Sequence, residues 1–432
     1  MMQQISKWNP EDEVFWAQKG KKIAKRNLWV SIAALFLAFA VWQIWSMTAV
    51  NLNKIGFNFT QQQLFTLAAL PGLSGATLRA IYTFVVPIFG GRNWTIISTA
   101  TLIVPAVGIG LAVQNPDTSF NTMAILAALC GFGGGNFASS MSNIGFFFPR
   151  SRQGTALGLN AGLGNFGVSV AQFLVPLVIT VGIFGKLGGI PQVMTDGTKV
   201  WLQNAGFVWV IPIVLTTIAS IFWMNNLPIK ASLAEQMVIL KRKHNWLLTY
   251  LYIMSFGSFI GYAAAFPLLI GIEFPQRGTA LAFLGPLIGA LIRPVGGWIS
   301  DKLGGARVTL WDNILMVLAT AGVIYFVGPD TKNFYGFFAM FMLLFFTTGI
   351  ANGSVFRMIP IVMKDKVESS GVVAFSSAVA AYGAFFIPKI FGWSIDITGS
   401  GTTALYIFLG YYLTTIFVTW FWYARNNAET PC

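Results

Sequence analysis

Twelve long apolar segments divide the chain and constrain its fold more than any other feature. A helix needs about 20 apolar residues to cross a bilayer, and each segment reaches about that length. The segments are continuous apolar runs without alternation, which excludes a transmembrane β-barrel. They cover 27–50, 64–90, 94–113, 121–148, 154–184, 205–226, 246–270, 279–299, 308–328, 334–361, 370–394 and 403–424. The sequence therefore predicts an all-α membrane protein with twelve transmembrane helices.

The remaining composition leaves little room for other classes of protein. Only 9% of the residues are charged, against about a quarter in a soluble domain. The two cysteines form no plausible disulfide framework, and the single histidine, His244, is expected in a solvated linker. Nothing resembles a metal cluster or a catalytic arrangement. We therefore expect no enzyme activity, no metal and no cofactor.

Lysine and arginine predict the orientation of the helices. With the N-terminus inside, the cytoplasmic stretches carry 19 of these residues and the outer loops carry 5. Basic residues accumulate in cytoplasmic loops of membrane proteins, so both termini are expected in the cytoplasm. The same bias accounts for the net charge of +13, and no nucleic-acid partner is expected.

A repeated spacing indicates two related halves. Arg79 and Arg293 are 214 residues apart, Gly90-Gly91 and Gly304-Gly305 share that offset, and Asn136 and Asn352 are 216 apart. Transporters are often built from such internal repeats, with the substrate site between them near the bilayer midplane. The expected organisation is an N-terminal segment 1–26, six-helix halves at 27–226 and 246–424, a linker 227–245 and a tail 425–432.

The two repeated arginines are the strongest candidates for a binding site. An arginine within a membrane helix costs about 2.5–3.5 kcal/mol on insertion scales. All 14 acids lie in loops or near helix ends by the predicted boundaries, so Arg79 and Arg293 lack an obvious carboxylate partner. A bound anion is the favoured partner; the alternative is a structural role against backbone carbonyls. A guanidinium presents paired, planar donors, which suit a planar oxyanion such as nitrate or nitrite.

Small and aromatic residues surround these arginines in the predicted helices. Gly154, Gly158 and Gly162 are each four residues apart, which puts them on one face where a neighbouring backbone can approach closely. An asparagine amide nearby can donate to an anion. Aromatic residues of the predicted helices wall a narrow cavity or serve packing alone: Phe39, Phe137, Tyr252 and Phe256.

Residues 297–307, Gly-Trp-Ile-Ser-Asp-Lys-Leu-Gly-Gly-Ala-Arg, resemble the loop 8–9 signature of the major facilitator superfamily. The resemblance implies a gating role for Gly297, Asp301, Lys302 and Arg307. The first half departs from this pattern, because Pro87 stands where the offset would place Asp301.

Within that superfamily the chain resembles the bacterial NarK-type nitrate/nitrite porters over its whole length. Residues 156–167, Ala-Leu-Gly-Leu-Asn-Ala-Gly-Leu-Gly-Asn-Phe-Gly, are similar to the first signature of that family. Helix eleven matches the second signature less well, with Ala374, Ala380 and Ala384 where glycines are expected. The resemblance implies substrate contacts from Arg79, Arg293, Asn165 and Tyr252, and a pocket lined by Phe39, Phe137, Phe256, Gly162 and Gly164.

The expected function is secondary active transport of nitrate and nitrite across a bacterial inner membrane, as antiport, in nitrate assimilation or respiration. The expected state is a monomer in contact with membrane lipid. Three alternatives remain open at this point: proton-coupled nitrate symport, organophosphate or other organic-anion antiport, and an anion channel.

Overall fold

The computed structural model describes residues 5, 7–83, 85–228, 237–364 and 366–432. The chain forms two compact units. The N-terminal unit comprises Met1–Phe59 and Leu70–Ser232, and the C-terminal unit comprises Thr60–Ala69 and Leu233–Cys432.

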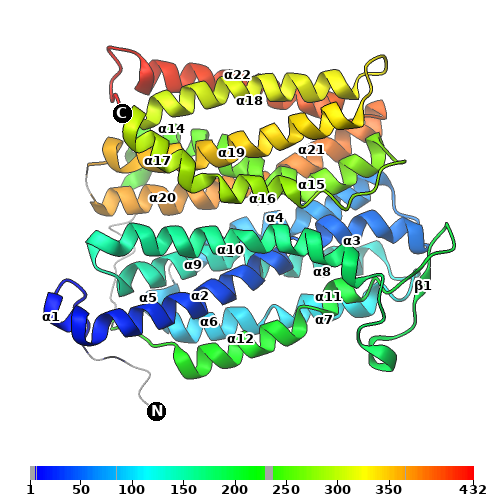
Figure 1. Ribbon diagram of the computed structural model, residues 1–432, viewed down its shortest axis with the longest axis horizontal. Coiled ribbons are helices and arrows are strands. Elements are labelled where there is room, and N and C mark those ends of the chain that lie inside the picture. Colours follow the sequence, from blue (N-terminus) through cyan, green and yellow to red (C-terminus); the bar gives the residue numbers. More distant parts are fainter. Residues whose placement is uncertain (1–4, 6, 84, 229–236, 365) are drawn as a thin grey trace. The chain divides into compact units, whose positions relative to one another are not determined.

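The N-terminal unit consists of packed helices and one small hairpin (Figure 1). Its elements are α1 (Glu13–Phe15), η1 (Trp16–Gly20), α2 (Lys21–Trp42), α3 (Ile44–Leu52), η2 (Asn53–Ile55), most of α4 (Gln61–Tyr82), α5 (Val85–Phe89), α6 (Gly91–Ala100), α7 (Ile103–Ala112), α8 (Phe120–Leu129), α9 (Gly131–Phe147), α10 (Arg150–Val178), η3 (Gly185–Gly188), β1 (Gln192–Val193), β2 (Lys199–Val200), α11 (Asn204–Phe207) and α12 (Val210–Trp223).

The regular secondary structure in the described residues of the C-terminal unit consists of helices. Its elements are η4 (Met237–Lys241), α14 (Lys243–Tyr252), η5 (Ile253–Gly257), α15 (Ser258–Glu273), α16 (Leu284–Leu291), α17 (Arg293–Leu303), α18 (Gly305–Val327), α19 (Phe334–Val362), α20 (Lys366–Ala381), α21 (Gly383–Thr398), α22 (Thr402–Thr419) and η6 (Trp420–Ala424).

Helices long and apolar enough to cross a membrane dominate both units, and the described residues contain 11 of them. The remaining predicted segment, 279–299, corresponds to two consecutive shorter helices, α16 and α17. They separate at Ile292, just before Arg293 and Pro294. Proline has no backbone N–H and disfavours helical geometry in the residue before it, which explains the break. The predicted all-α membrane fold is confirmed.

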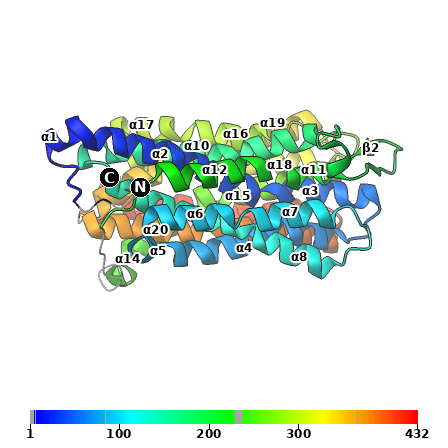
Figure 2. The same cartoon turned by 90° about the horizontal axis from the view of Figure 1, so that it is seen from below.

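The predicted segment 94–113 also contains a break. Here α6 and α7 run in line, separated by Thr101 and Leu102 (Figure 1, Figure 2). The loop before α11 contains a structure that the apolar pattern does not predict: β1 pairs antiparallel with β2, with Gln192 opposite Val200. The backbone N–H of Thr195 in this hairpin donates to the carbonyl oxygen of Lys54 at 2.9 Å.

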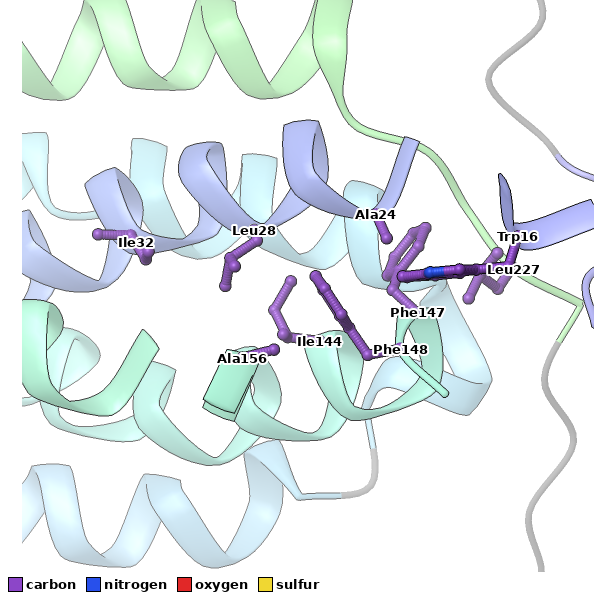
Figure 3. Packing of buried hydrophobic residues seen from close by; sticks show 9 residues of the cluster. All are labelled: Trp16, Ala24, Leu28, Ile32, Ile144, Phe147, Phe148, Ala156 and Leu227. Atoms are coloured by element: carbon purple, nitrogen blue, oxygen red, sulfur yellow. The ribbon is translucent and has the colours of Figure 1, made fainter. Parts of the chain in front are cut away.

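One face of α2 anchors the core at one end of the N-terminal unit (Figure 3). Ala24, Leu28 and Ile32 recur every fourth residue, which places them on one side of a helix. They pack with aromatic and aliphatic side chains from η1, the end of α9, the start of α10 and the segment after α12: Trp16, Ile144, Phe147, Phe148, Ala156 and Leu227. On another side of α2, Arg26, Trp29 and Ala33 are exposed.

The first turns of α4 belong to the C-terminal unit, which includes Thr60–Ala69. Two contacts within that unit involve them. The Phe65 ring stacks on Phe391 with centroids 6.5 Å apart. The Nζ of Lys389 donates to the Thr66 hydroxyl at 2.9 Å.

The expected linker, 227–245, is partly helical. Residues 229–236 lie outside the described part, but η4 begins at Met237 and α14 begins at Lys243. The expectation of a solvated His244 is wrong. Its ring Nδ1 lies 3.1 Å from the Tyr423 hydroxyl, and its Nε2 lies 3.3 Å from Glu429 Oε1. The histidine therefore helps to hold the tail against the start of α14.

Candidate functional site

Arg79 lies near the end of α4 and is fully buried. Its Nε donates to the backbone carbonyl oxygen of Gly134 at 3.1 Å. Its guanidinium carbon lies 4.8 Å from the centroid of the Phe137 ring and 5.5 Å from that of Trp42. The negative faces of aromatic rings attract a cation, so these rings stabilise the charge of Arg79.

Glycines let the helices around Arg79 approach one another. A Cβ on Gly134 would lie 2.8 Å from the Cα of Gly75 and 2.7 Å from Cε2 of Trp42. Real Cβ contacts are never this short, so only glycine permits α4 and α9 to pack at this distance. The Trp42 indole is fixed in turn, because its Nε1 donates to the Pro71 carbonyl oxygen at 2.6 Å.

Phe39 completes this aromatic group in the N-terminal unit. Its ring centroid lies 5.6 Å from that of Trp42 and 6.1 Å from that of Phe137, the latter in an edge-to-face arrangement. Arg79, Phe39 and Phe137 were named from the sequence, and the fold brings all three together. Trp42 was not among the site residues predicted from the sequence.

Arg293 is the first residue of α17, at the helix break. Its guanidinium carbon lies 4.2 Å from the centroid of the Phe259 ring and 5.6 Å from that of Phe256. Its Nε and Nη2 atoms are buried and have no hydrogen-bond partner in the part of the chain that the structure describes. Within the same described residues no ion pair includes Arg293.

Tyr252 is buried at the end of α14, where the helix passes into the π-helical turn η5. Its hydroxyl accepts a hydrogen bond from Asn352 Nδ2 at 3.0 Å. Its ring stacks on Phe356 at 4.5 Å and on Phe256 at 5.8 Å. Single π-helical turns are frequent at functional sites, and here the turn carries Phe256.

Three neighbours of the C-terminal site residues were not predicted as site residues: Phe259, Asn352 and Phe356. Asn352 carried a signal in the sequence, since it stands 216 residues after Asn136, but that offset indicated only the repeat. The two phenylalanines carried none, because phenylalanine is abundant throughout the chain.

Asn165 lies on α10 and is 1% exposed. One amide hydrogen on its Nδ2 is donated to the Ala161 carbonyl oxygen at 2.7 Å. Its Oδ1 is buried and finds no hydrogen-bond partner among the described residues. An amide nitrogen carries two donors, so one remains for a ligand.

The glycines of α10 differ from the expected pattern. At Gly158 and Gly162 no described atom lies within 4 Å of where a Cβ would be, so these two positions lack the close backbone approach expected there. The close approach occurs at Gly164 and Gly167 instead. A Cβ on Gly164 would lie 2.6 Å from Leu35, and one on Gly167 would lie 2.1 Å from the Phe36 carbonyl oxygen.

The motif at 297–307 spans the turn between α17 and α18. Asp301 forms an ion pair with Arg357 of α19 through the Arg357 Nε. The Nζ of Lys302 lies 3.9 Å from the centroid of the Trp298 ring. Gly297 has open space around it, and Arg307 is exposed.

Asp312 differs from the expectation that the acids lie near helix ends. It lies two turns inside α18 and is 5% exposed. Its Oδ2 is buried without a hydrogen-bond partner in the described part of the chain. The sequence did not indicate this burial. The structure buries the acidic Asp312 and leaves the adjacent aromatic residue Trp311 71% exposed. Among the described residues, no group of three histidine, cysteine, aspartate or glutamate side chains is arranged to hold a metal ion.

Comparison with known proteins identifies the family of this chain. The model of the Major Facilitator Superfamily matches residues 30–356. The chain is 49% identical to the nitrate/nitrite transporter NarU of Salmonella typhimurium, over 98% of this chain and 97% of the relative. It is 42% identical to the probable nitrate/nitrite antiporter NarK2 of Thermus thermophilus, over 99% of this chain and 98% of the relative.

Solved structures support the fold alone. A D-xylose–proton symporter aligns with a TM-score of 0.67 at 16% identity, covering 91% of this chain and 96% of that one. The nucleoside transporter NupG aligns with a TM-score of 0.63 at 12% identity, covering 91% and 98%.

Proposed function

Since the chain belongs to the major facilitator superfamily and, within it, to the nitrate/nitrite transporters, we propose that it exchanges nitrate for nitrite by alternating access. It is a multi-pass membrane transporter and not an enzyme. In the proposed mechanism Arg79 and Arg293 hold the anion, while Asn165 and Tyr252 orient it.

The observation that carries this proposal is the buried side of the Arg293 guanidinium. Its Nε and Nη2 donors have no partner among the described residues, and these two atoms form one edge of the guanidinium plane. Such an edge donates two parallel hydrogen bonds to two oxygens of one planar anion. Nitrate and nitrite both present two oxygens on one central atom, in a plane.

The free-energy cost of leaving the Arg293 donors without a partner favours a bound anion. A buried donor left without a partner costs about 1–3 kcal/mol, and Arg293 has two such donors. Each cation–π contact returns about 0.5–2 kcal/mol, so at the middle of both ranges the rings of Phe256 and Phe259 return about 2.5 kcal/mol against a cost of about 4 kcal/mol. An anion on the free edge satisfies both donors and the charge together.

The same reasoning supports exchange over one-way movement. The empty site keeps the positive charges of Arg79 and Arg293 in a membrane-embedded setting, where charge is expensive. A carrier whose closed state is stabilised only by an anion rarely reorients when empty. Each direction of the cycle then needs an anion, so one anion enters as the other leaves.

The first test replaces Arg293 by Lys, which keeps the charge and removes the planar fork. We expect nitrate uptake by proteoliposomes to fall at least about tenfold, because the loss of one charge-assisted hydrogen bond has about that effect. Arg277→Lys is the matched control, because Arg277 is exposed and lies over the rings of Phe334 and Tyr335. Arg79→Lys should behave like Arg293→Lys. Near-normal uptake in both variants, with the protein intact, removes the arginines from the site.

Exchange has its own test. Vesicles loaded with nitrite should take up external nitrate without a pH gradient, and empty vesicles should not. Uptake into empty vesicles driven by an inward proton gradient would refute exchange.

One observation favours a second candidate, proton-coupled nitrate symport. Asp312 is a buried carboxyl within a membrane-spanning helix, and such residues often mark proton pathways. It lies on α18, which packs against α19 and α22. Asp312→Asn removes the titratable group with little change in shape. Exchange predicts unchanged nitrate counterflow in this variant, whereas symport predicts that proton-driven uptake is lost.

The finer assignments belong to the same proposal. We place the protein in a bacterial inner membrane with both termini in the cytoplasm, on the strength of the lysine and arginine bias. We expect it to act as a monomer in contact with lipid, without a cofactor. Its role is nitrate assimilation or respiration.

A further inference from the structure

The N-terminal unit carries a groove of about 920 Å³ between α2 and α12. That volume is near the upper end of the roughly 300–1,000 Å³ typical of ligand clefts. The lining residues recur at helical spacing on one face of each helix: Arg26, Trp29, Val30 and Ala33 on α2, and Leu215, Thr216, Ile218, Ala219, Phe222 and Trp223 on α12.

This groove is lined by a different side of α2 from the one that carries Leu28 and Ile32. Leu28 and Ile32 point into the core (Figure 3), whereas Trp29 is 57% exposed. On the facing helix Phe222 is 67% exposed. Because the two helices belong to membrane spans, the medium that meets these apolar walls is lipid.

A single arginine stands at one end of the groove. The Arg26 Nη2 donates to Asn225 Oδ1 at 2.7 Å. Asn225 is itself fixed by Asn27, whose Oδ1 accepts from the Asn225 backbone N–H at 2.8 Å. This contact uses one of five guanidinium donors. No ion pair within the described ranges involves Arg26, so its charge is available to an outside anion.

The dimensions match one leaflet of a bilayer. At 1.5 Å per residue, Arg26 to Ala33 spans about 10 Å and Leu215 to Trp223 about 12 Å. One leaflet contributes about half of the ~30 Å hydrocarbon core. Trp29 and Trp223 lie near the charged end, where tryptophan favours the membrane–water boundary.

We propose that this groove is a binding site for an anionic phospholipid, with the phosphate on Arg26 and an acyl chain between α2 and α12. Charge complementarity selects the anionic class. Exposed basic residues surround the charged end: Lys19, Lys21, Lys22 and Lys25. Clusters of four to eight basic residues beside a transmembrane helix attract anionic lipids, and the groove gives that attraction a defined place.

The test compares phosphatidylglycerol with phosphatidylcholine on the full-length protein. The two lipids are mixed in equal amounts, and native mass spectrometry counts those that stay bound. Arg26→Gln should lower the retention of phosphatidylglycerol about tenfold, as expected for one charge-assisted hydrogen bond. Lys25→Gln is the matched control. It also removes one positive charge, at the adjacent residue, but Lys25 does not line the groove.

A second variant tests the apolar part. Ala219→Phe fills the groove and leaves every charge in place, so it should also lower the retention of phosphatidylglycerol. Equal losses in Arg26→Gln and Lys25→Gln, or no loss in either, would overturn the site. So would full retention in Ala219→Phe, or equal binding of phosphatidylcholine by the unchanged protein. Melting temperatures of the variants in detergent establish that they remain folded.

Discussion

The hydrogen bond from Asn352 to Tyr252 offers the sharpest test of the C-terminal site. The Tyr252 oxygen accepts this bond, and in the proposed mechanism its O–H donates a hydrogen bond to the anion. The ring itself is held by stacking on Phe356 at 4.5 Å with an interplanar angle of 11°. Asn352→Ala should therefore change the direction of the hydroxyl while the ring stays in place.

The magnitudes follow from the kinds of bond involved. Asn352→Ala removes a neutral hydrogen bond worth about 1 kcal/mol, which raises the apparent KM for nitrate about fivefold. Tyr252→Phe removes a donor to a charged ligand, worth about 1.5–3 kcal/mol, and should raise KM by about 10-fold to 100-fold. Because Asn352 is expected to act through Tyr252, its removal from the Tyr252→Phe variant should add almost nothing.

The assay is nitrate counterflow in nitrite-loaded proteoliposomes for the unchanged protein, both single variants and the double variant. Asn313→Ala is the matched control, because Asn313 is equally buried in the same unit and donates to Thr419 at 3.2 Å. It should leave KM unchanged. Additive effects of the two substitutions would show that Asn352 acts independently of the hydroxyl and refute the reasoning.

Three further outcomes are expected. Asn165→Ala should raise the KM for nitrate through the loss of an amide donor, and an unchanged KM and rate would assign Asn165 to packing. Gly167→Ala should lower the melting temperature, because the new Cβ would meet the Phe36 carbonyl oxygen at 2.1 Å. Gly158→Ala is the control, since that position has open space. Equal melting temperatures of the two variants would contradict the close approach. The hydrogen bond from Lys243 holds the pKa of Glu429 below its usual value. A depressed pKa stabilises the folded form above the unfolded value of about 4.3, so the tail should stay docked at neutral pH and be released only as the pH falls through the lowered value. Hydrogen exchange of residues 425–432 measures this, and release at pH 6 would count against it.

The sequence predicts the fold of this protein well because a bilayer demands long apolar helices, and these are visible as continuous runs. It predicts the breaks within them less well. The interruption at Ile292 is local and coincides with Pro294, whereas the π-helical turn Ile253–Gly257 contains no proline. Hydropathy carries no signal for such a turn.

The candidate site was predictable where one residue stands out chemically from its surroundings. Arginines in apolar helices are rare and costly, so Arg79 and Arg293 were visible at once. Phe259 and Phe356 were not, since an aromatic ring beside a cation looks in sequence like any other buried ring. Asp312 was misjudged for a related reason. The predicted segment 308–328 placed it near a helix end, whereas α18 begins at Gly305, and the sequence did not indicate which side of α18 faces inward.

The two halves repeat the backbone more faithfully than the charges. Gly90 and Gly304, at the same place in each half, both have positive φ, 81° and 91°, a conformation that glycine adopts without strain. Two residues later, the N–H of Arg92 donates to Asn226 Oδ1 and that of Ala306 donates to the Cys432 carbonyl oxygen, each at 2.9 Å.

The ion pair of Asp301 with Arg357 has no counterpart built from the same residue types, because Pro87 occupies the position of Asp301. The turn at Gly90 thus recurs at Gly304, whereas no ion pair of the neighbouring Arg92 is found within the described part of the chain. A charged latch on one half can bias which side of the membrane the site faces, which a symmetric pair of latches would not do. We therefore expect the asymmetry to affect the direction of exchange: Asp301→Asn should alter the ratio of inward to outward nitrate flux while leaving the KM for nitrate unchanged.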